Sequence, residues 1–475
     1  MKTKYIAHIT IEADTPLKVG SNSSDFLQDS LIQKDWNGLP MILGTSIAGV
    51  LRKHYRDEYD RKEKSDEPLK YESNKLFGFQ KDKGDEGIGS KVILSNALLL
   101  DEKREVNERL MVKEKSEFLK IFDNLPIREH TAIAHTGAID PNKNAKFDEE
   151  VLYKGTQFKF SIEVLEDETA FKNLLELLQS PSFRLGGGTT KGFGKFKVLE
   201  IVTKIIDNHK TLAKHSSSLN RDLSKLGSDG FSLLEFRAKA SDSEQKTIKA
   251  KNYTTYTLKI EPDNFFMFGA GFGDSDADQT PVYEKVVDYS IGDLSDKQIL
   301  IPASSVKGAL SHRTAFYYNQ SQEIYSDKLN KEEFNNYVAE NNNAVKAIFG
   351  HKKEMPDDVE LGQKGKILIS DCFEKAEENS TKTFDHVSID RFTGGAIDGA
   401  LFNEKTIAQR DEWDIEILLE NDVKQEFKDA FEKALKDVCT GMLALGGATT
   451  KGHGVFCGTL EENGKEIFDG GCSNE

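Results

Sequence analysis

Two short glycine-rich segments, each with one lysine, have the composition of an anion-binding site. Residues 186–194 read GGGTTKGFG and residues 446–454 read GGATTKGHG. Glycine tolerates positive φ and lets the backbone approach a ligand, so consecutive N–H groups can form a concave nest for an anion. Lys191 and Lys451 would add a point charge for a phosphate. A tight turn before a strand would explain one such segment, whereas two copies that both keep the lysine favour contact with phosphate or RNA.

Known nucleotide-binding motifs do not account for these segments. The GxxxxGK[ST] spacing of a phosphate-binding loop fails, because Gly192 and Gly452 follow the lysines. The segment GAGFG at residues 269–273 likewise lacks the GxGxxG dinucleotide pattern. The sequence therefore argues against nucleotide hydrolysis and hydride transfer.

The glycine-rich segments belong to a longer internal repeat. Four further pairs of segments keep the same order in both halves of the 475-residue chain: LGTSIAG and PASSVKG (43–49 and 302–308), LFG and IFG (76–78 and 348–350), KVILSNA and KILISDC (91–97 and 366–372), and TGAID and GGAID (136–140 and 394–398). A chain of 475 residues is more consistent with two hydrophobic cores than with one. We therefore predict two copies of one domain, and the predicted parts are a first domain at 1–205, a linker at 206–250, a second domain at 251–465 and a frayed tail at 466–475.

Composition places the chain in the class of soluble, cytoplasmic proteins. Only 37% of the residues are hydrophobic, and no apolar run approaches the roughly 20 residues that a membrane span needs. The N-terminus has no apolar core of the kind found in signal peptides. The four cysteines form no CxxC pair, which favours a reducing compartment and argues against a structural zinc site.

Basic stretches without acidic residues coincide with the repeated segments. The chain has a formal net charge of −16, yet residues 42–56 and 302–318 contain arginine and lysine and no acid. Around the glycine-rich segments, residues 181–198 contain one arginine and three lysines, and residues 441–460 contain Lys451, again with no acid. Global charge does not decide the charge of a local groove. These stretches therefore indicate an anion-binding surface inside an acidic protein.

Hydrophobic periodicity predicts the same succession of elements in both halves. In the first half we expect strands at 1–17, 153–166 and 194–201 and helices at 46–59 and 168–180. In the second half we expect strands at 252–267, 409–420 and 454–460 and helices at 304–318 and 424–439. Strand, helix, strand, strand, helix, strand is the order of the α+β ferredoxin-like or RRM-like fold, here with a long insertion after the first helix. RNA-binding proteins use this fold often, but the fold alone does not establish function.

Several segments together resemble the RAMP superfamily. The segments ILGTSIAGVLRKH and IPASSVKGALSHR resemble its IPGSSxKGxLR motif, and LGGGTTKGFGKFKV resembles its C-terminal glycine-rich loop. An aspartate ahead of the helix makes the pattern similar to the backbone subunits of type III CRISPR effector complexes. Because the resemblance covers both halves, it implies two tandem RAMP domains in a fused double backbone subunit, as occurs in subtype III-D.

The resemblance implies catalytic roles for loop aspartates. In the backbone group a loop aspartate cleaves target RNA, which makes Asp29 the expected catalytic residue of the first half, with Asp35 as its second acid. In the second half Asp278 precedes the Pro-Val of the family pattern, and Asp276 and Asp274 are close alternatives. The 2′-OH of RNA supplies the nucleophile, so cleavage needs proton removal and charge neutralisation at the phosphate. Mg²⁺ or Mn²⁺ held by Asp29 and Asp278 is the expected cofactor.

The resemblance also implies which residues grip RNA. Thumb hairpins that kink guide and target are expected at 128–140 and 390–402, with wedging side chains Ile139, Ile397 and Leu401. The residues expected to contact RNA are Arg52, Lys53, Arg128, Gly187, Lys191, Ser304, Ser305, Lys307, Arg313, Arg391, Gly447 and Lys451. The expected partners are a CRISPR guide RNA, a target RNA and other RAMP-type subunits, and no membrane.

Two hypotheses about function remain open. The protein is either a metal-dependent endoribonuclease with one site in each half, or a non-catalytic scaffold for guide RNA whose partners do the cutting. The first half departs from the family pattern at Ala48, where a lysine is expected, and at Leu43, where a proline is expected, which leaves room for one inactive site. A third possibility, a stand-alone guide-processing ribonuclease, needs a general-base histidine, and the candidates His130 and His135 lie only in the first half.

Overall fold

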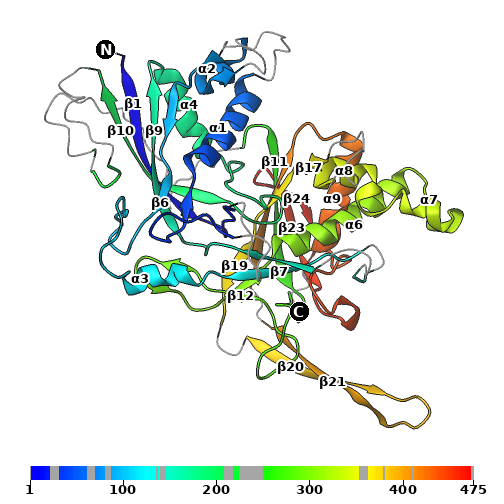
Figure 1. Ribbon diagram of the computed structural model, residues 1–475. Coiled ribbons are helices and arrows are strands. Elements are labelled where there is room, and N and C mark those ends of the chain that lie inside the picture. The colour runs from blue at the N-terminus through cyan, green and yellow to red at the C-terminus, as the bar shows by residue number, and fades with distance from the viewer. Residues whose placement is uncertain are drawn as a thin grey trace.

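The computed structural model contains two α/β units formed by the two halves of the chain (Figure 1). The structure describes residues 2–21, 31–60, 70–80, 87–134, 137–139, 146–207, 218–221, 223, 250–351, 362–377, 380–408 and 411–471. Among the helices in these ranges, none is both long and apolar enough to cross a membrane.

The first half forms an antiparallel sheet with helices packed against it. The central strand β1 (Lys4–Ala13) pairs with β9 (Gln157–Leu165) on one side and with β10 (Phe196–Ile206) on the other. Apolar residues of helices α1 (Gly44–Tyr59) and α4 (Glu168–Leu178) share one buried core with this sheet. The smaller elements of this half are β2 (Met41–Ile42), α2 (Glu72–Phe77), β3 (Phe79–Gln80), β4 (Gly87–Ile88), β5 (Val92–Leu94), β6 (Ala97–Leu99), α3 (Glu117–Lys120), β7 (Ile127–Thr131) and β8 (Lys146–Glu150).

The second half repeats this arrangement around its own core. The central strand β11 (Tyr253–Pro262) pairs with β22 (Trp413–Glu420) and with β23 (Phe456–Glu462). Helices α6 (Ala303–Ser321) and α9 (Gln425–Cys439) contribute to a second buried core. The other elements are β12 (Tyr283–Glu284), β13 (Val287–Asp288), β14 (Asp293–Leu294), β15 (Gln298–Ile301), α7 (Lys331–Asn335), α8 (Asn343–Phe349), β16 (Gly350–His351), β17 (Gln363–Lys364), β18 (Ile367–Ile369), β19 (Cys372–Lys375), β20 (Thr381–Ile389), β21 (Ala396–Ile407) and β24 (Lys465–Asp469).

The strand order is the same in both sheets. It runs β10-β1-β9-β5 in the first sheet, where β6 also pairs with β9, and β23-β11-β22-β18 in the second, so in each half the first strand lies between the third and the fourth. This is the ferredoxin-like order, and all the pairings are antiparallel. The predicted fold is therefore present in both halves.

The repeated KVILSNA and KILISDC segments position the first helix of each half. The first N–H group of α1, from Gly44, donates to Asn96 Oδ1 at 2.9 Å. At the equivalent place Ala303 N–H of α6 donates to Asp371 Oδ1 at 2.8 Å. A helix N-terminus leaves N–H groups unsatisfied, so the two segments cap the helices from outside.

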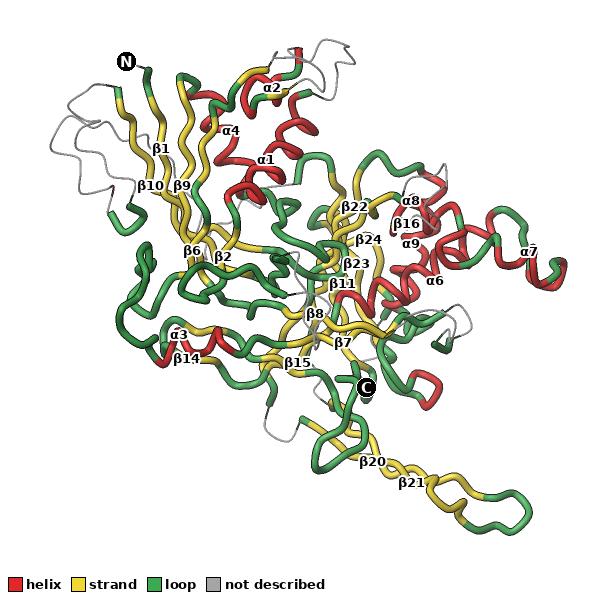
Figure 2. Tube along the Cα trace, viewed as in Figure 1, coloured by secondary structure: helices red, strands yellow, loops and turns green. Residues whose placement is uncertain are grey.

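Each half also carries a hairpin beside its sheet. Strands β7 and β8 pair from Ile127↔Glu150 to Thr131↔Lys146, and the longer pair β20 and β21 projects away from the body of the protein (Figure 2). One expectation about the C-terminus is wrong in part. Residues 466–469, expected in a frayed tail, belong to β24, because Lys465–Asp469 pairs with β23 and extends the second sheet.

The two halves meet along an extensive junction. Gly192 of the first glycine-rich segment forms a parallel bridge with Ser370, and Val287 N–H donates to the carbonyl oxygen of Lys154 at 2.9 Å. Gly155 has φ +85°, and a Cβ there would lie 2.2 Å from the carbonyl oxygen of Val287. The backbones of the two halves therefore approach as closely as glycine permits.

Candidate nucleic-acid interface and acidic loop

The two glycine-rich segments are turns that dock on neighbouring backbone. Gly186 and Gly446 have φ +83° and +94°, and a Cβ on either would lie within 2.5 Å of a carbonyl oxygen in the facing segment. The following N–H groups, of Gly187 and Gly447, donate to those same oxygens at 2.7 Å. These two N–H groups, expected at a phosphate, are therefore used to close the turn.

The lysines of both segments face carboxylates. Lys451 Nζ donates to Glu404 Oε2 at 2.8 Å, and Lys191 Nζ lies 3.7 Å from Glu149 Oε1. Although burial alone would raise it, the pKa of Glu149 is lowered to about 2 by the neighbouring His130 and the lysines. The loop lysines are thus held in place rather than pointing freely into solvent.

The first glycine-rich segment and helix α6 bring basic groups together at the junction. Lys307 of the repeated helix motif donates from Nζ to Thr190 Oγ1 at 3.2 Å, which joins the second half to the first. On the same helix Ser304 is half-buried and Ser305 is exposed. The predicted RNA-binding residues of two distant motifs therefore lie in one place.

This place holds a group of basic side chains, which we call the junction cluster: Lys53, His54, Lys307 and Lys364. Burial, and then the charges of Lys191 and Lys364, lower the pKa of Lys307 to about 8. Burial, and then Lys53 and Lys364, lower the pKa of His54 to about 4. Burial, and then Lys53, lower the pKa of Lys364, although Glu420 opposes this shift. Within the described part of the chain, no ion pair engages the three lysines. The cluster therefore has unbalanced positive charge, the property of a phosphate site.

Arg128 lies inside the protein rather than on a hairpin surface. Its guanidinium pairs with both carboxylate oxygens of Glu284 and, at 2.5 Å, with Asp371 Oδ2. Burial opposes the charge, but Asp371 and Glu284 raise the pKa of Arg128. Asp371 is the same residue that caps α6 at Ala303. Arg128, expected to contact RNA, thus ties the first hairpin to the second half.

Two further arginines expected at RNA are engaged within their own halves. Arg52 donates to Asn74 Oδ1 at 2.7 Å. Arg313 forms an ion pair with Asp437 of α9. Both contacts hold a helix to its neighbours, so neither guanidinium is fully available to a ligand.

The second hairpin presents exposed side chains along its length and at its tip. Phe392 is 100% exposed, Leu401 72% and Ile397 47%. Arg391 is exposed beside Phe392. In the first half Ile139 is 55% exposed, and the segment that follows it lies outside the described residues. The residues named as wedges are therefore all accessible.

The acidic loop of the second half lies against β21. Asp278 Oδ2 accepts from Asn403 N–H at 2.9 Å, and Asn403 Oδ1 accepts from Asp278 N–H at 2.8 Å. Lys405 Nζ lies 2.8 Å from Asp274 Oδ2 and 3.4 Å from Asp276 Oδ2. The hydrogen bond from Lys405 contributes most to lowering the pKa of Asp274 to about 2. Asp278 is thus the member of the loop that does not pair with this lysine.

The expected metal sites are not preformed in the described residues. Asp29 lies outside those residues, and Asp35 Oδ1 accepts from Asn37 N–H and Leu39 N–H, which fixes a turn. The described ranges contain no group of three or more histidine, cysteine, aspartate or glutamate residues that could hold a metal ion. Carboxylate oxygens suit Mg²⁺ or Mn²⁺, but Asp274 and Asp276 already bind an ammonium group.

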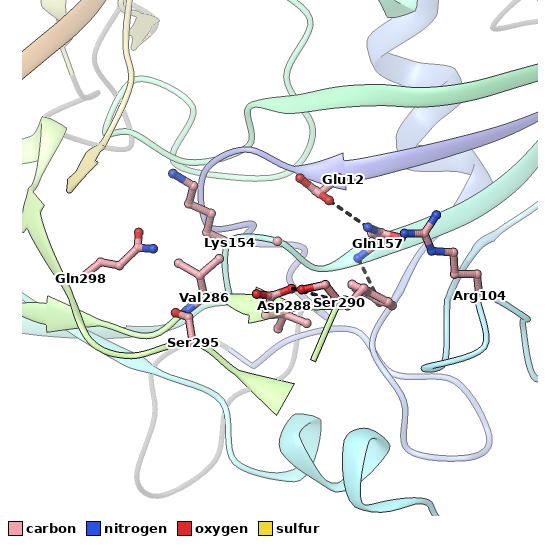
Figure 3. A pocket seen from close by; sticks show the side chains of 12 residues that line it. Glu12, Arg104, Lys154, Gln157, Val286, Asp288, Ser290, Ser295 and Gln298 are labelled. Carbon is pink, nitrogen blue, oxygen red and sulfur yellow. Dashed lines mark hydrogen bonds between the residues drawn. The ribbon is translucent and has the colours of Figure 1, made fainter. Parts of the chain in front are cut away.

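A pocket of about 320 Å³ also opens at the junction, between β9 and the β13–β14 hairpin (Figure 3). Its walls carry both signs of charge, with Arg104 and Lys154 against Glu12 and Asp288. Glu12 Oε2 accepts from Gln157 Nε2 at 2.8 Å. Balanced charge makes this pocket a weaker anion site than the junction cluster.

Sequence reasoning missed several residues that these sites bring together. Lys364 lies two residues before the repeated KILISDC segment, and its place close to Lys366 was a sequence signal for a basic site. Nothing in the local sequence indicates that Glu404 or Glu149 faces a loop lysine, because each contact joins residues more than 40 positions apart.

Comparison with known proteins accounts for the repeat. The sequence profile of the RAMP superfamily matches residues 10–197 and again residues 284–457. No curated protein matches the chain in sequence. The two matched regions contain the first helix, both glycine-rich segments and the hairpin of each half, and the second region begins after strand β11. The chain therefore belongs to the RAMP superfamily and contains two RAMP regions in tandem.

Proposed function

We propose that this protein is a double backbone subunit of a type III CRISPR effector complex, of the III-D kind, that binds guide RNA and cleaves complementary target RNA. Membership of the RAMP superfamily supports a CRISPR-associated role. The proposed partners are a guide RNA, a target RNA and other RAMP-type subunits.

The junction cluster carries the RNA-binding part of the proposal. Lys53, Lys307 and Lys364 come from three elements that are distant in sequence and converge where the halves meet. Burial and neighbouring positive charges lower the pKa of Lys307 and of Lys364, so a polyanion that entered would relieve this repulsion. A phosphodiester backbone supplies such charge without requiring a particular base sequence, which leaves target choice to the guide.

The acidic loop carries the cleavage part of the proposal. Asp278 is exposed, and its contacts with Asn403 fix one carboxylate oxygen against β21. The other oxygen can orient the 2′-OH of a target nucleotide and accept its proton while the adjacent phosphate is attacked in line. Asp29 would have the same role in the first half. A divalent ion remains the expected cofactor, but because the described residues do not form its site, no step is assigned to it.

A scaffold without catalytic activity is the second candidate. It is favoured by the commitment of Asp274 and Asp276 to Lys405, which makes two of the three loop acids part of a structural ion-pair network. In this case the subunit would hold guide and target RNA while a partner cuts.

The test measures cleavage of an end-labelled target RNA by the assembled guide complex and compares the wild-type protein with its variants. Asp278→Asn should erase one cleavage product and Asp29→Asn another, while Asp276→Asn should leave both. Lys307→Gln combined with Lys364→Gln should weaken guide binding and lower the slope of log K against log salt concentration by about 2, since each phosphate contact contributes roughly one unit. Persistence of all products in the double aspartate variant would leave the scaffold as the function.

A further inference from the structure

A group of four side-chain types recurs at the base of both hairpins. In the second half the cross-strand pair His386 and Phe402 stacks with ring centroids 4.9 Å apart, and Lys451 Nζ lies 4.5 Å from the centroid of Phe402. Glu404, two residues after Phe402, accepts from Lys451 and from His386 Nε2 at 2.9 Å. We call these four residues the second clamp.

The first half contains a related arrangement, in which Glu149 Oε1 accepts a hydrogen bond from Lys18 Nζ at 2.6 Å and forms a longer ion pair with Lys191 Nζ at 3.7 Å. His130 and Phe147 are cross-strand partners with centroids 5.0 Å apart, and Lys191 Nζ lies 4.5 Å from the centroid of Phe147. Glu149 follows Phe147 by two residues, with its Oε2 3.4 Å from His130 Nε2. These residues form the first clamp. A histidine therefore occupies the same place in both halves, contrary to the expectation that only the first half offers one.

The clamps contain a buried charge that folding alone does not require. The side chain of Glu404 is fully buried, and it faces Lys451, which is 33% exposed, and His386, which is 29% exposed. His453 Nε2 is a third neighbour at 3.2 Å. Burying a carboxylate is costly, and an apolar replacement of a buried ion pair is often neutral or stabilising. The recurrence of the same four residue types in two hairpins of different length indicates a role beyond packing.

The geometry indicates what the carboxylate does. An ammonium group has three N–H donors, and Glu404 takes one donor of Lys451 while the ring of Phe402 lies beneath the charge. A lysine side chain is otherwise flexible and loses rotamer entropy when it is fixed on a ligand. With one donor anchored, the remaining donors can face a phosphate at the base of the hairpin without that cost.

We propose that Glu404, and Glu149 in the first half, are positioning residues that hold the glycine-loop lysine over the hairpin's aromatic pair, so that lysine and hairpin form one contact for the RNA backbone. The proposal deepens the proposed function and rests on it. The carboxylates act through the lysines and do not touch RNA themselves.

The test measures binding of a single-stranded RNA oligonucleotide to the full chain as a function of salt. Glu404→Asp keeps the charge but withdraws the carboxylate by one methylene, and should weaken binding by about fivefold, the loss of one well-placed phosphate contact. In a Lys451→Met background the same substitution should have no effect. Glu461→Gln, which removes a carboxylate paired with Lys259 on the sheet surface at 2.8 Å, is the control for net charge.

Each outcome separates the inference from the proposed function. The proposal would be overturned if Glu404→Gln bound RNA more tightly than Glu461→Gln while Glu404→Asp bound RNA like the wild type. Glu404 would then only screen the charge of Lys451. The proposal would also be overturned if Lys451→Met bound RNA like the wild type while Lys307→Gln and Lys364→Gln bound it more weakly. Absence of salt-dependent RNA binding by the wild-type chain would instead refute the proposed function. Thermal unfolding checks that each variant is folded.

Discussion

Replacing Arg128 by methionine should loosen the junction between the halves. The three side chains of this ion-pair group are buried, at 7% exposure for Arg128, 7% for Glu284 and 0% for Asp371. Methionine keeps most of the apolar stem but leaves two buried carboxylates facing each other without a counter-charge. Removing one partner of a buried ion pair typically costs about 3–5 kcal/mol. We expect a loss of that size from the unfolding free energy.

The two tryptophans allow each half to be followed separately. Trp413 is fully buried in the second core, whereas Trp36 is 61% exposed in the first half. In a Trp36→Phe background the fluorescence of Trp413 reports urea unfolding of the second half, where Asp371 caps α6. Arg128→Met should lower the urea midpoint of this transition, and adding Glu284→Gln should recover part of the loss because it removes one of the unpaired charges.

The control is an ion pair of the same type on the surface. Lys120 and Glu117 are 2.7 Å apart and 47% and 90% exposed, so Lys120→Met should cost at most about 1 kcal/mol. An Arg128→Met protein as stable as the Lys120→Met protein would refute the reasoning. Arg128 would then be free to serve RNA, as the sequence predicts.

Three further predictions concern the junction and the acidic loop. The pKa of Lys307 is about 8 in the folded protein and 10.5 in the unfolded chain, so between these pH values the unfolded chain binds more protons. The free energy of unfolding should therefore rise with pH in this range, while the affinity for RNA falls because Lys307 loses its charge. Lys307→Gln should flatten both pH profiles. Gly155→Ala should cost at least about 1 kcal/mol in thermal unfolding, since φ is +85° and the new Cβ would meet the oxygen of Val287. Chelation of divalent ions by EDTA should abolish target cleavage at Asp278 without releasing bound guide RNA, and unchanged cleavage would contradict the metal requirement.

Local sequence patterns were sufficient for the repeated core. Alternation in β11 and helical spacing in α1, α4 and α9 reflect burial of one face of each element, which is a property of residues near one another in the chain. Strand β1 differs, because it is buried on both faces from Ile6 to Ile11. The same patterns predicted the ferredoxin-like fold, since few strand orders are open to this succession of six elements.

Local sequence patterns predicted the candidate site only in part. The sequence marked Lys307 and the glycine-rich segments, but the roles of Arg128 and of Gly187 changed once their neighbours were known. Arg128 lies in a hairpin strand, and only the packing of the second half supplies Glu284 and Asp371 around it. The sequence suggested that the N–H of Gly187 would bind a phosphate, but in the structure this group donates to the carbonyl oxygen of Lys18.

The sequence by itself determined that the chain is a repeat, that each copy folds as a strand and helix succession, and that its basic residues concentrate in the repeated segments. Only the tertiary structure decided which of those basic residues remain unpaired and how the lysines of the glycine-rich segments are held. The reason is physical: periodicity and composition record local burial, whereas the state of a charge depends on the groups within a few ångströms of it. In this protein those groups come from the other half of the chain, as at Lys307, or from a distant strand, as at Lys451.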